Sequence, residues 1–218
     1  MDGIKEVNLS YISAPLAMIN REHKIIFVHI PKTGGTSVEK LFDDSFYGWD
    51  EKHSLWKQHC SIYQMQSVYG IDIRSYYKFA IVRNPWDRAV SDYKWWTRPS
   101  SPFFNFLKNT TLEDYLLIRN GYEKINHLND STGRADHFYT QYSFVEIDGR
   151  NCIDRIIRFE NLQQDFNLVC DEVGERRQQL PHTNKTNRKH YSEYYNQKTI
   201  DIVSQKYHKD IEYFDYQF

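Results

Sequence analysis

Two short apolar segments of the chain each lead directly into the start of a helix, and this arrangement restricts the possible folds more than any other feature. Residues 25–30 (IIFVHI) and 78–83 (KFAIVR) are rich in β-branched and aromatic side chains without polar alternation, which is typical of buried strands in a parallel sheet. Residues 154–159 (DRIIRF) are a third candidate strand. Alternation of such strands with helical segments predicts an α/β fold with a central, mostly parallel sheet flanked by helices.

Helical periodicity follows the predicted strands. After the first strand, Val38, Leu41 and Phe42 lie at i, i+3 and i+4, on one face of a helix. After the second strand, Asn84 is a good N-cap and Pro85 suits the first helical position. Further helices are predicted to begin near residue 160 and to occupy residues 198–214.

Another helix is predicted between the first two strands. Ser61 and Gln64 form an S-x-x-Q capping box, and Gly70 is a natural C′ residue at the end of the helix. His59 then lies just before the first helical turn.

Composition limits the classes of function. The 218 residues suit one domain over 1–218, which buries roughly 70 % of its unfolded surface without disulfide or metal staples. The formal net charge of −1 argues against a nucleic-acid binder that relies on bulk positive charge. The three cysteines, at positions 60, 152 and 170, form no CxxC pair, so we expect no structural metal site and a reducing compartment.

The N-terminal sequence does not resemble a secretory signal. Asp2 and Glu6 stand where a signal peptide carries positive charge, and no apolar run approaches the roughly 20 residues that span a membrane. Four N-x-[ST] triplets are interpreted as chance matches, at Asn8, Asn109, Asn129 and Asn184. We therefore expect a cytoplasmic protein, or the soluble domain of a longer anchored protein.

The first predicted strand ends in PKTGGTS (31–37), whose residue types suit an anion. Two glycines permit a tight turn and close backbone approach, and the helix that follows offers N–H groups at its start. Lys32 adds a cation, and Thr36 and Ser37 add hydroxyls. Because the lysine precedes the glycines, the loop is not a Walker A motif. A glycine-rich turn with a surface lysine is the alternative interpretation.

Arg83 ends the second predicted strand, where its guanidinium can hold a phosphate through two hydrogen bonds. The alternative is an arginine paired with a neighbouring carboxylate. Ser91 lies on the second turn of the helix that follows. Loops after parallel strands leave from one edge of a sheet, so we expect both segments on the rim where such folds bind ligands.

Taken together, FVHIPKTGGTSV (27–38) and FAIVRNPWDRAVSDY (79–93) resemble the two cofactor signatures of the sulfotransferase superfamily. The resemblance is to the branch that contains heparan sulfate 2-O-sulfotransferase-like enzymes and many bacterial relatives. Residues 58–61 (QHCS) and the tail from residue 180 agree with it, and it covers about residues 25–218. The resemblance implies a P-loop-like fold, 3′-phosphoadenosine 5′-phosphosulfate (PAPS) as sulfuryl donor and PAP as product.

The resemblance also implies roles for individual residues. His59 would be the general base and Lys32 the second catalytic residue. The remaining residues would bind PAPS: the 5′-phosphosulfate at Lys32, Thr33, Gly34, Gly35, Thr36 and Ser37, and the 3′-phosphate at Arg83 and Ser91, with Lys185 and Arg188 from the C-terminal loop.

Other side chains leave the assignment of the base open. His29 precedes the first loop, and His182 and His190 flank the tail motif. Glu160 is another candidate proton acceptor, although it and Asp87 are more simply explained as carboxylates that complement the dipole at a helix start. The alternative to a catalytic role is that His59 only caps the helix or packs against its neighbours.

The sequence therefore predicts metal-free transfer of a sulfuryl group from PAPS to an acceptor hydroxyl, which the resemblance places on a saccharide. Trp95 and Trp96 are candidates for substrate contact or for the core, and residues 44–58 and 96–150 are candidate acceptor loops. The alternatives are a P-loop-like nucleotide kinase and a non-catalytic nucleotide-binding module. We expect no nucleic-acid partner, and the sequence does not define the acceptor or the oligomeric state.

Overall fold

A four-stranded sheet forms the centre of the protein, in a computed structural model that describes residues 19–39, 49–50, 55–101, 104–121, 137–181 and 188–218. Its strands are β1 (Ile19–Asn20), β2 (Ile25–Val28), β5 (Tyr77–Val82) and β8 (Arg155–Arg158), in the order β1-β2-β5-β8. The strands β2, β5 and β8 are parallel, and the short β1 is antiparallel to β2. The predicted α/β fold with a mostly parallel central sheet is confirmed.

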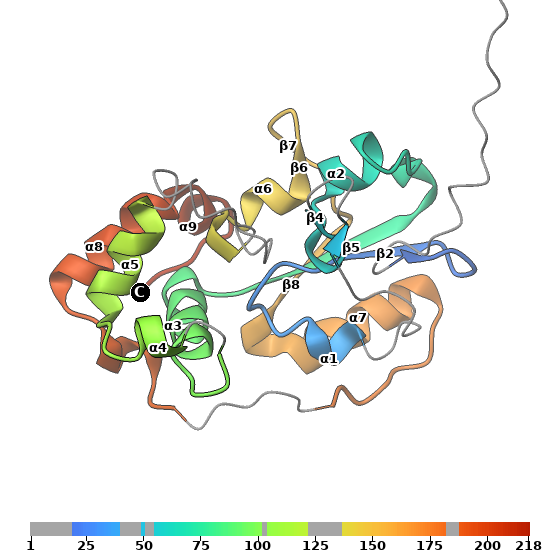
Figure 1. The fold of residues 1–218 in the computed structure, drawn as a ribbon. Helices are drawn as coiled ribbons and strands as arrows, with labels where there is room; N and C mark the ends of the chain where they lie inside the picture. The colour runs from blue at the N-terminus through green and yellow to red at the C-terminus, as the bar shows by residue number, and fades with distance from the viewer. Residues whose placement is uncertain (1–18, 40–48, 51–54, 102–103, 122–136, 182–187) are drawn as a thin grey trace, which may run out of the picture.

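Side chains of the parallel strands alternate between two apolar cores, one on each face of the sheet. On one face, Ile26, Val28, Ala80 and Val82 pack with α2 (Ile62–Ser67), α6 (Tyr142–Val145) and α8 (Gln197–Lys206). On the other face, strand residues pack with α1 (Thr36–Glu39) and α7 (Leu162–Val173); they are Ile25, Phe27, Phe79, Ile81 and Ile157. Figure 1 shows α1 and α7 below the sheet and α2 and α6 above it.

A group of helices lies beyond the sheet, on the left in Figure 1. It contains α3 (Pro85–Trp96), α4 (Phe104–Leu107), α5 (Leu112–Gly121), α8 and α9 (His208–Tyr213). The strand β5 leads into α3, so α3 connects the sheet to this group. The segment 96–150, expected to supply acceptor loops, thus contains helices α4, α5 and α6 and the two-stranded sheet of β6 (Glu146–Ile147) and β7 (Arg150–Asn151).

The remaining elements are short. The strands β3 (Trp49–Asp50) and β4 (Leu55–Trp56) pair antiparallel. Short 3₁₀ helices occupy residues Lys57–His59, Ile73–Ser75, Phe159–Asn161 and Tyr191–Tyr194. Among the described helices, none is long and apolar enough to cross a membrane.

The local signals for helix starts are confirmed. Asn84 caps α3 by accepting hydrogen bonds from the N–H groups of Trp86 and Asp87, with Pro85 at the first helical position. The capping box of Ser61 and Gln64 is also present.

Several boundaries differ from the prediction. The second and third strands span Tyr77–Val82 and Arg155–Arg158, so Arg83 directly follows its strand and does not end it. The first strand ends at Val28, two residues early. The C-cap of α2 is Val68, so the C′ position falls on Tyr69 and Gly70, predicted to be C′, lies one residue beyond it. The predicted helix over 198–214 is divided at Tyr207 into α8 and α9. Of the apolar residues predicted for the first helix, Leu41 and Phe42 lie outside the described residues.

Candidate active site

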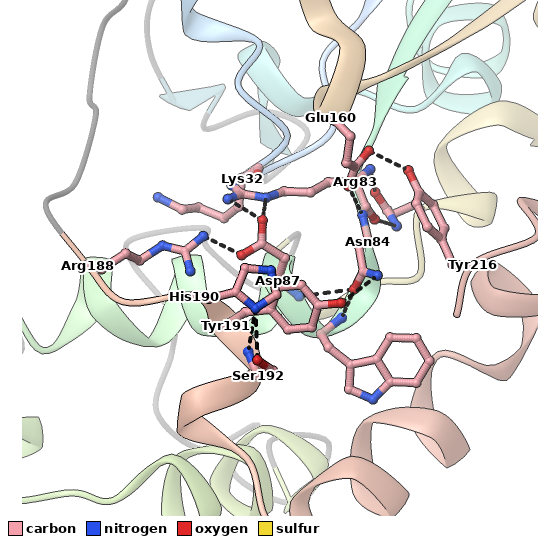
Figure 2. A network of polar contacts seen from close by, with 12 residues as sticks. Lys32, Arg83, Asn84, Asp87, Glu160, Arg188, His190, Tyr191, Ser192 and Tyr216 are labelled. Carbon is pink, nitrogen blue, oxygen red and sulfur yellow. Dashed lines mark hydrogen bonds and ion pairs between the residues drawn. The ribbon is translucent and has the colours of Figure 1, made fainter. Parts of the chain in front are cut away.

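The loops that follow β2 and β5 meet at the carboxyl edge of the sheet, as the sequence predicted. Nη1 of Arg83 donates a hydrogen bond to the backbone carbonyl of Lys32 at 3.0 Å. Figure 2 shows both residues, with the Arg83 guanidinium directed toward the first loop. Two segments far apart in the sequence therefore meet at this edge.

Two residues of the first loop have a left-handed backbone conformation. Lys32 has a φ of 68° and Gly34 a φ of 86°, both in the left-handed region. A Cβ atom on Gly34 would lie 2.8 Å from the ring of Phe159, and one on Gly35 would collide with the ring of His29. The two glycines thus allow the rings of Phe159 and His29 to pack directly against the loop. This packing was not predicted from the sequence.

The hydroxyl groups of the loop differ in their surroundings. Thr33 is fully buried and donates its hydroxyl to the carbonyl of Ile30 at 2.8 Å. Thr36 is half-buried and begins α1, and the N–H of Ser37 donates to the carbonyl of Gly34 at 3.1 Å. The Thr33 side chain therefore braces the loop, and Thr36 and Ser37 stand at the helix start.

Asp87 joins the second loop to the C-terminal part of the chain. Its Oδ2 atom accepts a hydrogen bond from Nε of Arg83 at 2.8 Å, and Nη2 of Arg83 lies 2.7 Å from the same oxygen. Arg188 forms a second ion pair with the same carboxylate (Figure 2). Arg83 is only 6 % exposed, and this burial lowers the pKa of its guanidinium while Asp87 acts in the opposite direction. In this structure Arg83 is thus paired with a carboxylate, as the alternative interpretation described.

A stripe of α3 connects these groups. Asp87, Ser91 and Trp95 follow each other at intervals of four residues, which places them on one helix face. Nζ of Lys32 lies 4.1 Å from the centre of the Trp95 ring, and Cζ of Arg98 lies 3.2 Å from it. Ser91 therefore lies one helix turn after Asp87, which binds Arg83, and one turn before Trp95, which contacts Lys32. Lys185 lies outside the described residues.

Buried side chains fix the backbone of Arg83. The amide of Gln141, itself fully buried, accepts the Arg83 N–H at 2.9 Å and donates to the Arg83 carbonyl at 2.8 Å. Asp210 in turn accepts the N–H groups of Gln141 and Tyr142 at 2.8 and 2.9 Å. Burial raises the pKa of Asp210, against the lowering effect of these two bonds. Asp210, from the C-terminal helix α9, thus positions Gln141, and Gln141 positions the backbone of Arg83.

Glu160 has a structural place in the same network. One of its oxygens accepts the N–H of Asn84 at 2.7 Å, and the other accepts the hydroxyl of Tyr216 at 3.2 Å (Figure 2). Both carboxylate oxygens therefore bind donors that position the start of α3 and the end of the chain.

His59 lies at the centre of a row of three buried histidines. It ends the short helix Lys57–His59 and is 7 % exposed. Its ring makes an edge contact with the ring of His29, at 4.9 Å between centres, and with that of His137, at 5.5 Å. Sequence analysis singled out His59 and His29 but gave no indication of His137.

His29 is held on both sides of its ring. Its Nδ1 is hydrogen-bonded to the carboxylate of Glu39, and its Nε2 edge faces the backbone of Gly35. Burial alone would raise the pKa of Glu39, but the bonds from His29 and from Gln58, the latter at 2.7 Å, lower it overall. Both nitrogens of His29 thus face protein atoms, which disfavours it as a base.

The other histidines named from the sequence lie elsewhere. His190 caps the helix Tyr191–Tyr194, and its Nδ1 lies 2.8 Å from the hydroxyl of Ser192 (Figure 2). His182 lies outside the described residues. Within the part of the chain that the structure describes, no cluster of three or more His, Cys, Asp or Glu residues has a geometry for a metal ion.

Sequence analysis missed the polar side of α3 that faces the histidine row. Arg88 and Asp92 are almost completely buried, and Trp96 follows one turn later. The available signal was a pair of charged residues at i and i+4, with a tryptophan four residues further on, in the helix predicted to follow the second strand. Their partner His137 had none, because the contact joins segments 45 residues apart.

The β2–loop–α1 unit, followed by the parallel strands β5 and β8, makes this a P-loop-like α/β protein with a polar site at its carboxyl edge. The sequence model of the sulfotransferase family matches residues 15–217, and the chain belongs to this family. Among solved structures it is similar to a sulfotransferase from Alicyclobacillus acidocaldarius, with 15 % sequence identity and a TM-score of 0.42 over 99 % of this chain and 94 % of that chain. None of the curated proteins compared with the chain matches it.

Proposed function

We propose that the protein transfers a sulfuryl group from PAPS to a hydroxyl group of a saccharide. Membership of the sulfotransferase family supports the class of reaction, and the resemblance of residues 27–38 and 79–93 to the family's cofactor signatures supports the donor. One structural observation carries the proposal. Lys32, Arg83 and Arg188, from three separate segments, converge at the carboxyl edge of the sheet.

The residue types at this edge fit a donor with two anionic groups. The loop 32–37 supplies one cation, two hydroxyls and the backbone of a helix start for the 5′-phosphosulfate. Arg83, Ser91 and Arg188 supply two guanidinium groups and a hydroxyl for the 3′-phosphate, with Lys185 as a further candidate. Because the Thr33 hydroxyl is engaged by Ile30, Thr33 contributes its backbone only.

Lys32 and His59 then carry the chemistry. PAPS supplies an activated sulfuryl group, so the acceptor oxygen forms a bond to sulfur while the bond from sulfur to the bridging oxygen breaks. The electron pair of that bond leaves with PAP, and Lys32 stabilises the negative charge that grows there. His59 takes the proton of the attacking hydroxyl, for which a neutral imidazole is well matched near pH 7. Positioning and electrostatic stabilisation supply the remaining acceleration.

A transfer assay tests this function. The purified protein is incubated with sulfate-labelled PAPS and a panel of glycans, lipids and small phenols, and label is sought in each acceptor. We expect label on a saccharide. Activity confined to phenols or lipids contradicts the acceptor class, and magnesium-dependent ATP turnover favours a kinase. Tight PAP binding without transfer to any acceptor favours a binding module. The cytoplasmic location expected from the sequence is tested separately by cell fractionation.

The role of His59 is tested by His59→Ala. A lost general base lowers kcat by about 10²- to 10⁴-fold and removes the acidic limb of the pH–rate profile. PAP affinity remains nearly unchanged, because the base contacts the acceptor. A folded variant that keeps more than about a tenth of wild-type kcat, an effect below roughly 1.4 kcal/mol, contradicts this role. The matched control is His208→Ala, at an exposed histidine outside the site.

A further inference from the structure

One stripe of α3 builds a socket around His137. Arg88, Asp92 and Trp96 follow each other at intervals of four residues. Arg88 donates to the carbonyls of Tyr139 at 3.0 Å and His137 at 3.4 Å, and also to that of Pro31 at 2.9 Å. The ring of Trp96 lies 5.5 Å from that of His137. The socket therefore fixes both the backbone and the ring of His137 relative to the first loop.

His137 and Asp92 form a buried pair at the bottom of this socket. Nδ1 of His137 lies 2.7 Å from Oδ1 of Asp92, and the two side chains are only 3 % and 1 % exposed. The other oxygen of Asp92 accepts the hydroxyl of Tyr115 at 2.8 Å. Since a carboxylate accepts, Nδ1 carries the hydrogen and Nε2, which is also buried, is the acceptor of the neutral ring. Burying such a pair costs free energy that apolar side chains would not, which is why it suggests a function.

We propose that Asp92 and His137 are positioning residues for His59, which hold its imidazole and stabilise its protonated form. This inference rests on the proposed function, in which His59 accepts the proton of the acceptor hydroxyl. At that step the ring becomes an imidazolium inside the protein. A buried carboxylate one ring away lowers the free energy of the charged form, and the edge contact with His137 sets the orientation of the ring.

The two sides of the histidine row have different tasks. The titratable groups that the described contacts place around His59 are His29 and Glu39 on one side, with His137, Asp92 and Tyr115 on the other. The ring of His29 is packed against Gly35 and stacks on Phe27, so its contacts shape the anion loop. His137 packs instead against α3. Its position is set by α3, and its ring contacts His59 and Trp96.

Nuclear magnetic resonance of histidine-labelled protein tests the inference without turnover. The imidazole signal of His59 is assigned with His59→Gln and followed through a pH titration. In Asp92→Asn, which keeps an acceptor for His137 but removes the charge, we expect the His59 titration midpoint to fall by about one pH unit. In Tyr115→Phe, which keeps the charge, we expect no change. A His59 midpoint that is the same in wild type and Asp92→Asn overturns the proposal.

A second variant covers the case in which Asp92→Asn does not fold. The side-chain amide of His137→Asn can still donate to Asp92, so the buried carboxylate remains hydrogen-bonded, but the ring beside His59 is lost. We expect the His59 midpoint to fall in this variant also. A rise, as expected from removing a merely repulsive neighbour, or no change overturns the proposal.

Kinetics give the readout for catalysis. In Asp92→Asn we expect kcat to fall about tenfold, KM for PAPS to stay within about twofold, and the acidic limb of the pH–rate profile to move to lower pH. A loss of kcat with an unmoved pH profile indicates a structural role only and overturns the proposal. If the wild-type protein transfers no sulfuryl group, the proposed function fails, and the titration of His59 still decides whether Asp92 acts on that ring.

Discussion

The guanidinium of Arg83 donates a hydrogen bond at 3.0 Å to the backbone carbonyl of Lys32, 51 residues earlier in the chain. The same guanidinium binds Asp87, so one side chain ties the first loop to α3. Arg83 therefore combines two tasks. It fixes the relative position of the two signature segments, and it places a buried positive charge where a phosphate is proposed to bind.

The first prediction concerns the specificity of this charge. We expect PAP to bind at least tenfold more tightly than AMP, because the 3′-phosphate adds a charge-assisted pair that can contribute a few kcal/mol. Arg83→Lys keeps a charge but loses the planar fork, and it should reduce the PAP affinity toward that of AMP. Calorimetric titration measures both ligands. Arg177→Lys, at an arginine paired with Asp171 on the surface, is the control.

The outcome that contradicts this prediction is equal affinity for PAP and AMP in the wild-type protein. An Arg83→Lys variant that retains the full discrimination would assign the 3′-phosphate to Arg188 or to another cation.

How far sequence predicts this fold depends on the range of each interaction. The N-cap of Asn84 and the capping box of Ser61 are set by residues within three positions, so the sequence contains the whole signal. The strand cores are equally local, since their apolar runs are continuous. The division of the last helix at Tyr207 was not predictable in this way. Tyr207 is almost completely buried in the main core, and the core position of its ring depends on the tertiary structure.

The second prediction separates catalysis from binding at Lys32. In Lys32→Ala we expect most turnover to be lost while PAP affinity falls much less, because only contacts that strengthen in the transition state raise kcat. Single-turnover kinetics and PAP titration measure the two effects. Lys198→Ala, which removes a surface lysine paired with Glu113, is the matched control.

A Lys32→Ala variant with normal kcat and only a raised KM for PAPS would be inconsistent with this role. Trp95→Leu adds a useful comparison. The Trp95 ring contacts Nζ of Lys32, so its loss should change kcat in the same direction as Lys32→Ala but by less.

The third prediction concerns the packing of the first loop. A methyl group at Gly35 would collide with the ring of His29, so Gly35→Ala should destabilise the protein by about 1–3 kcal/mol. For a chain of this length each kcal/mol corresponds to roughly 2–4 °C in Tm. Gly149→Ala is the control: no atom lies within 4 Å of the added methyl group, so its cost reflects the positive φ of 76° and not a collision.

A double-mutant cycle identifies the collision. His29→Ala removes the ring, so Gly35→Ala should cost less in the His29→Ala background than in the wild type. The coupling between the two changes should exceed about 0.5 kcal/mol, as for residues in contact. Additive effects in thermal unfolding would show that the loop does not meet this ring.

The candidate site shows where sequence reasoning ends. Lys32 and Arg83 became candidates because each lies at the end of a recognisable strand, and strand ends of a parallel sheet share one rim. Gln141 was not found, although it binds the backbone of Arg83 through both ends of its amide. Its position depends on Asp210, which lies 69 residues later in the chain, in the helix α9. No local pattern records such a chain of contacts.

The last prediction uses the pKa of Glu39, which lies below its ordinary value of 4.5 because of the bonds from His29 and Gln58. A carboxylate whose pKa is lower in the folded state than in the unfolded state stabilises the fold fully above pH 4.5. This stabilisation is lost as the pH falls through the lower, folded-state value. Glu39→Gln should therefore be destabilised by about 1.5–3 kcal/mol at pH 7, the usual contribution of hydrogen bonds to a charged group.

The difference between Glu39→Gln and wild type should then shrink below pH 4.5, because the unfolded wild-type chain binds a proton there, and it should reach its minimum once the pH is below the folded-state pKa of Glu39. Urea unfolding at pH 7, 5.5, 4 and 3 measures the free energy of unfolding of both proteins. Glu193→Gln, at an exposed carboxylate 3.4 Å from Lys189, should change it little at any pH. A constant difference for Glu39→Gln across the whole range would mean that packing, and not the charge beside His29, stabilises this end of the histidine row.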